Sequence, residues 1–198
     1  MIDMARKRRK YEFRPDKPKS TFFNKLYLTQ KQQKSVLKWA LYGVALLLLS
    51  VIQDTMLSKA AIFGTTTDLV PCAILLICVL QGTESGCVFA LVASMLFVFS
   101  GTAPGAYVIA FLVLLGTGAA AFRQAFLRKG FSAAMLCTSV VFLVYELAVF
   151  SVGLGMGLTT FDRIIRFLVT AGITFVTAPI IYPIVLSIGK IGGETWKE

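Results

Sequence analysis

The chain has 198 residues, of which 57% are hydrophobic and 15% are charged, and its formal net charge is +10. Soluble domains usually carry about 25% charged residues, so this composition argues against a soluble fold and equally against collagen, coiled-coil and disordered chains. The sequence contains no histidine, which excludes Ser-His-Asp triads, Cys-His dyads and histidine-ligated metal sites.

The first segment, residues 1–35, is predicted to be a basic cytoplasmic tail. Residues 1–38 hold twelve Lys or Arg and three acids, a net charge of +9, whereas the remaining 160 residues sum to +1. The tail lacks the plan of a cleaved signal peptide, so we expect the apolar stretch that follows it to be retained. Its basic run is a candidate contact for anionic lipid of the inner leaflet, not for nucleic acid; the alternative is a solvated signal for topology. The run consists of Arg6, Lys7, Arg8, Arg9 and Lys10.

Apolar stretches fill the chain from residue 36 to residue 190, the predicted membrane domain. A helix that crosses a bilayer needs about 20 mostly apolar residues. Gly-, Ser- and Pro-containing breaks divide this domain, for example at residues 81–86 and 100–105. The pattern predicts an all-α integral membrane protein with a six-helix transmembrane bundle and a short cytoplasmic C-terminus at 191–198. The six spans are placed at about 36–57, 66–83, 86–100, 105–122, 131–152 and 164–188.

The number of spans determines which loops face the cytoplasm. Residues 60–122 contain no Lys or Arg and are long enough for three spans. Three spans there place the basic tail, the loop 123–130 and the C-terminus on the same side, as the positive-inside rule prefers, whereas two spans would separate them. We therefore expect a multi-pass protein of the bacterial plasma membrane with both termini in the cytoplasm. The most apolar part of the second span, Leu69–Leu80, is short for a full crossing.

Acidic side chains in or near the spans are candidate functional groups, because burying a charge without a partner is costly. Glu146 lies well inside the fifth span, while Asp54 and Asp68 lie near the outer ends of the first and second. Glu146 is a candidate proton or cation site or a polar contact with a partner; the alternative is a purely structural hydrogen bond to a neighbouring helix. We expect no pair of carboxylates at matched depth and no nucleophile beside a base. The sequence therefore predicts no enzymatic activity, no cofactor and no metal site.

Several short motifs resemble those of one membrane protein family. Gln53-Asp54-Thr55 closes the first span, Thr67-Asp68-Leu69 opens the second and Gln81-Gly82 closes it. A Gly- and Pro-containing turn at 100–105 follows the third span, and Tyr182-Pro183 lies in the last. From the first span onward, the chain resembles the bacterial rod shape-determining protein MreD family, as a divergent member.

This resemblance implies a non-enzymatic membrane component of the cell-wall elongation machinery that takes part in the regulation of rod shape. It implies scaffold contacts with MreC, MreB and wall-synthesis enzymes, and no small-molecule substrate. The alternative is a substrate-binding membrane subunit of an energy-coupling-factor vitamin transporter, a class whose fold is similar to that of MreD. Such a subunit would need a pocket near the outer face, with Gln53, Asp54 and Asp68 as its polar groups.

Overall fold

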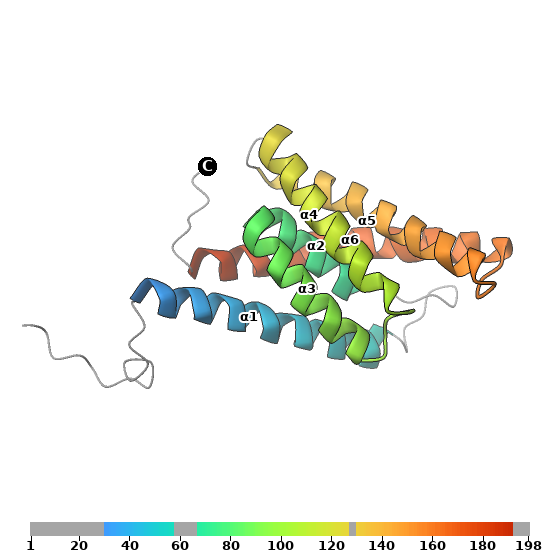
Figure 1. Ribbon diagram of the computed structural model, residues 1–198, viewed down its shortest axis with the longest axis horizontal. Coiled ribbons are helices and arrows are strands. Elements are labelled where there is room, and N and C mark those ends of the chain that lie inside the picture. The colour runs from blue at the N-terminus through green and yellow to red at the C-terminus, as the bar shows by residue number, and fades with distance from the viewer. Residues whose placement is uncertain (1–29, 58–66, 127–129, 192–198) are drawn as a thin grey trace, which may run out of the picture.

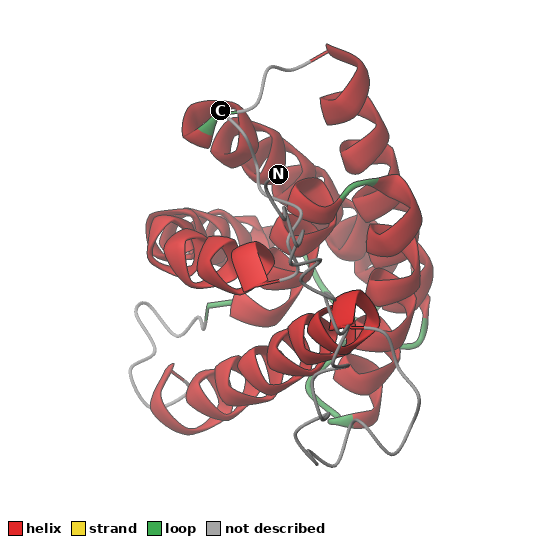
Figure 2. Cartoon of the chain, turned by 90° about the vertical axis from the view of Figure 1, so that its left-hand side faces the viewer, coloured by secondary structure: helices red, strands yellow, loops and turns green. Residues whose placement is uncertain are grey.

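The computed structural model describes residues 30–57, 67–126 and 130–191 (Figure 1). Over these residues the chain is helical with no strand, which confirms the all-α prediction. Figure 2 shows the same residues as helices joined by short loops. The helices are α1 (Gln30–Ile52), α2 (Leu69–Gln81), α3 (Thr83–Phe99), α4 (Tyr107–Phe126), α5 (Phe131–Gly155) and α6 (Ile164–Ile191), with a π-helical turn η2 (Gln53–Leu57) and a 3-10 turn η3 (Phe161–Arg163).

Four helical segments of the described chain are long and apolar enough to cross a membrane. The other two helices are shorter, since α2 has 13 residues and α3 has 17. At 1.5 Å per residue, α2 is about 20 Å long, less than the roughly 30 Å of a bilayer core. Within the second predicted span, 66–83, the described residues form α2 over Leu69–Gln81, and Thr83 already begins α3. The four long segments are Gln32–Thr55, Tyr107–Phe126, Phe131–Gly155 and Phe161–Ile191.

The short helix α2 forms the centre of the molecule. Every residue from Leu69 to Leu80 is buried, and α1, α3, α4, α5 and α6 all contact this helix. A helix enclosed on all sides has no need of a polar face, which explains why its sequence is apolar all round. In Figure 1, α1 begins and α6 ends toward the same end of the bundle.

Two glycines allow the neighbouring helices to approach α2 closely. A Cβ at Gly86 of α3 would lie 3.1 Å from the Cα of Cys78, and a Cβ at Gly116 of α4 would lie 3.2 Å from its Sγ. Ala120, one turn after Gly116, is also fully buried. Small residues one turn apart on α4 thus lie where this helix is buried against its neighbours, as is usual for close helix packing in membranes.

A buried polar network joins α1, α2 and α6 at the end where α1 begins. The Nζ of Lys38 donates to Oε1 of Gln81 (2.9 Å), and Nε2 of Gln81 donates to the hydroxyl of Tyr42 (2.7 Å). The Tyr42 hydroxyl in turn donates to the carbonyl of Val185 (3.1 Å). A Cβ at Gly189 would lie 3.1 Å from that hydroxyl, so α6 packs directly over the network.

The position of Arg123 differs from the prediction, which placed this residue in the loop 123–130. The helix α4 continues to Phe126, beyond the predicted end of its span at residue 122. The Arg123 side chain is buried and its guanidinium donates a hydrogen bond to the backbone carbonyl of Val79 in α2. A residue counted as a loop charge therefore holds two helices together, because its long stem reaches inward to an otherwise apolar helix.

Candidate functional site: a buried carboxyl pair and an apolar groove

Two carboxyl groups meet in the interior, contrary to the expectation that no such pair exists. Asp68 precedes the first residue of α2, and Glu146 lies in α5, where its side chain is only 6% exposed. Their side chains are hydrogen-bond partners of each other. Two carboxylates repel, so a hydrogen bond between them requires a proton on one of the two. At least one of the two carboxyl groups therefore carries a proton.

The backbone at the start of α2 explains why the Asp68 side chain is available for this pairing. Aspartate at this position usually caps its own helix, yet the Asp68 carboxylate makes no cap hydrogen bond. Other helices supply the acceptors instead. The amide of Asp68 donates to Oγ1 of Thr174 in α6 (3.1 Å), and the amide of Val70 donates to Oε1 of Gln53 after α1 (3.1 Å). Because residues from α6 and from the end of α1 accept the backbone hydrogen bonds at the start of α2, the Asp68 carboxyl group is available to interact with Glu146.

A small pocket of about 180 Å³ opens onto Glu146. The pocket lies between α4, α5 and α6, at the end of the bundle where α5 ends and α6 begins. Two of its oxygens are buried and receive no hydrogen bond from the described residues, namely Glu146 Oε1 and Thr159 Oγ1. The rings of Phe150 and Phe167, with centroids 5.4 Å apart, belong to the same wall. The remaining lining residues are Pro104, Tyr107, Val149, Gly153 and Leu158.

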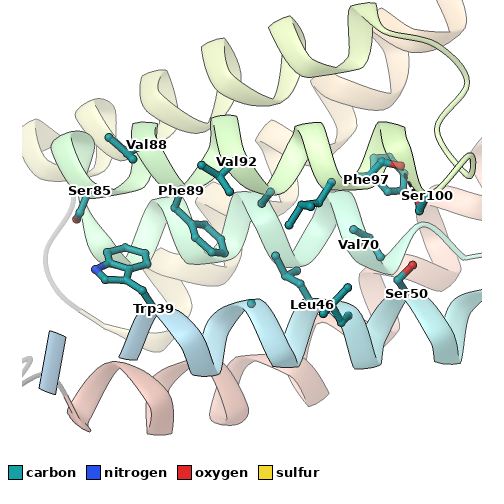
Figure 3. A pocket seen from close by; sticks show the side chains of 14 residues that line it. Trp39, Leu46, Ser50, Val70, Ser85, Val88, Phe89, Val92, Phe97 and Ser100 are labelled. Carbon is teal, nitrogen blue, oxygen red and sulfur yellow. Dashed lines mark hydrogen bonds between the residues drawn. The ribbon is translucent and has the colours of Figure 1, made fainter. Parts of the chain in front are cut away.

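A larger groove of about 480 Å³ runs between α1 and α3 (Figure 3). Trp39 and Phe89, whose ring centroids are 5.4 Å apart, lie at one end, and Ser50 and Ser100 lie at the other. Val70 of the central helix also lines the groove. Its lining is apolar except for three serine hydroxyls and the indole N–H of Trp39. The other lining residues are Gly43, Leu46, Leu47, Ser85, Val88, Val92, Ala93, Leu96 and Phe97.

The predicted site residues have separate places in the structure. Asp68 and Glu146 are brought together, whereas Asp54 is exposed on the turn η2. Gln53, its neighbour, is buried and serves the start of α2. The basic run Arg6, Lys7, Arg8, Arg9 and Lys10 lies outside the described residues.

Sequence reasoning missed the threonines that complete these sites. Thr174 lies in the middle of an apolar helix and Thr159 in a turn, so neither stands out from spacing or composition. The shortness of the apolar stretch Leu69–Leu80 was the available signal. A short helix enclosed by its neighbours can begin inside the bundle, and the acid in front of it then lies there too.

No protein-family model, curated protein or solved structure matches this chain. Over the described residues, the chain is an apolar all-helical bundle with four helical segments that are long and apolar enough to span a membrane.

Proposed function

We propose that the protein is a six-span scaffold of the bacterial plasma membrane that acts, without catalysis, in cell-wall elongation and the control of rod shape. The proposal combines the motif resemblance to the MreD family with one structural observation, the open apolar groove between α1 and α3. In this proposal the groove receives a single transmembrane helix of a partner. MreC is the companion that the resemblance implies for this position, with MreB and wall-synthesis enzymes in the same assembly.

The lining of the groove supports a helical occupant. Helices pack in membranes where small residues let their backbones approach, and Gly43, Ser50 and Ala93 provide such positions here. From Trp39 to Ser50 the groove follows α1 for about 16 Å, or three helical turns. Its apolar walls suit an apolar helix, because such a helix brings no side-chain polar group that must be paired.

The two cavities favour a scaffold over a vitamin-binding subunit. Sites for small molecules usually measure about 300–1,000 Å³ and contain a few placed polar groups. The pocket at Glu146 is smaller, at about 180 Å³, and the side chains of the larger groove offer as polar groups only three serine hydroxyls and the Trp39 indole N–H. Neither combines the volume with the polar groups that recognition of a vitamin requires.

The experiment fills the groove without disturbing the fold. A Cβ at Gly43 meets no atom within 4 Å, and the same is true of Gly118 on α4, which does not line the groove. We expect Gly43→Phe to accumulate normally, to lose co-purification with MreC and to give wide or round cells when it is the only copy. Gly118→Phe is the matched control and should support rods of normal width.

Two results would count against the proposal. Normal rods and undiminished co-purification with Gly43→Phe would show that the groove is not the partner site. Loss of vitamin uptake with rods intact, after depletion of the protein, would favour the transporter subunit instead.

A further inference from the structure

We propose that the pocket between α4, α5 and α6 binds a small protonated amine, with Glu146 and Thr159 as acceptors of its N–H groups. The ligand is a primary alkylammonium ion of a few atoms, or the amino head of a larger molecule. This site is built from other helices than the α1–α3 groove, so it stands independently of the scaffold proposal.

Two buried acceptor oxygens on the pocket indicate that its ligand carries hydrogen-bond donors. Glu146 is 94% buried, lines the pocket, and its Oε1 receives no hydrogen bond from the described residues. Thr159 Oγ1, on the same pocket, is also buried without a partner in that part of the chain. Buried acceptors are normally paired, so two of them on one small cavity call for an occupant that donates. An ammonium group has several N–H donors and no acceptor.

The carboxyl pair and the aromatic residues that line the pocket narrow the chemical class of the ligand further. An ammonium ion beside the Asp68–Glu146 pair favours the ionised form of a carboxyl group there, because opposite charges attract. The walls include the rings of Phe150, Phe167 and Tyr107, and aromatic faces attract ammonium groups. A metal ion is a poorer match, because the described residues hold no group of three His, Cys, Asp or Glu side chains that would ligate one.

The volume limits the size of the ligand. About 180 Å³ corresponds to roughly six water molecules at 30 Å³ each. A propylammonium ion fits within that volume, with its alkyl chain against Val149 and Leu158. So small a ligand makes few contacts, and we expect its affinity to be in the millimolar range.

The test measures thermal unfolding of the full chain in detergent while propylammonium chloride replaces sodium chloride at constant ionic strength. A ligand that binds only the folded state raises the unfolding midpoint as its concentration rises, here up to about 100 mM. We expect a saturating rise for the unaltered protein. Tetramethylammonium chloride, a cation without N–H donors, should produce no rise.

Matched variants locate the effect. Glu146→Gln replaces the carboxyl group that lines the pocket with an amide that cannot ionise and should weaken the response at least tenfold. Thr159→Val removes the other acceptor and should weaken the response about threefold. Asp54→Asn removes an exposed acid outside the pocket and should respond like the unaltered protein. The proposal is overturned if the unaltered protein shows no rise, or if the rise persists in both Glu146→Gln and Thr159→Val. A rise that Asp54→Asn abolishes would also overturn it, since the binding would then lie elsewhere.

Discussion

The carboxyl groups of Asp68 and Glu146 share a hydrogen bond although one residue precedes α2 and the other lies in the interior of α5. The 13-residue length of α2 makes this contact possible, because a short helix enclosed by five others starts at the depth where Glu146 lies. Thr174 and Gln53 satisfy the backbone at that start, which leaves the Asp68 side chain to its partner.

Substitutions at Glu146 should separate the hydrogen bond from the charge. Glu146→Gln keeps a donor for Asp68, and we expect it to lower the free energy of unfolding by less than about 1 kcal/mol. Glu146→Ala leaves Asp68 unpaired and should lower it by about 1–3 kcal/mol. Denaturant unfolding in detergent measures both. Equal losses for the two variants would mean that the carboxylate charge, not the hydrogen bond, is what the fold needs.

Gly82, between α2 and α3, has a backbone conformation that only glycine adopts readily. Its φ is +92°, and an added Cβ would also run into the side chain of Gln124. We expect Gly82→Ala to lower the free energy of unfolding by about 1–3 kcal/mol. Gly118→Ala is the control, because its Cβ meets open space in a helix, where alanine should stabilise by roughly 0.5–1 kcal/mol. A harmless Gly82→Ala would disprove the turn geometry.

Two lysines four residues apart on α1 should differ sharply. Lys38 is buried and donates to Gln81, whereas Lys34 is exposed. Lys38→Met leaves Oε1 of Gln81 without this donor, and we expect a loss of about 1–3 kcal/mol in unfolding free energy. Lys34→Met should change stability by less than about 0.5 kcal/mol. The prediction is wrong if the two variants lower the thermal midpoint by the same amount.

Reporter fusions can decide between six crossings and four. In the six-span topology, fusions after residues 84, 103, 126 and 158 report inside, outside, inside and outside in that order. If α2 and α3 instead form a hairpin that enters and leaves from one side, the fusion after residue 84 will not report the cytoplasm. Positions 126 and 158 serve as references, since they flank α5, which is long enough to span.

Much of the architecture follows from composition and spacing. A chain that is 57% hydrophobic, with Gly- and Pro-containing breaks, must satisfy its backbone within helices if it lies in a bilayer, and the all-α prediction rests on that requirement. The same pattern predicted helical stretches where the described residues form α1 to α6, of which four segments are long enough to span a membrane. The pattern of neighbouring residues suffices to predict these features, because helix formation and turn formation depend on interactions over a few residues.

Depth and pairing were decided only by the tertiary structure. Reasoning from linear order placed Asp68 near an outer surface and Arg123 in a loop, yet the fold buries Arg123 against Val79 and joins Asp68 to Glu146. Such contacts depend on how far a short central helix lies inside its neighbours and on where a long side chain can reach. The physical reason is that packing brings together residues far apart in the chain. The sequence of one segment does not determine how deeply a neighbouring segment will be buried.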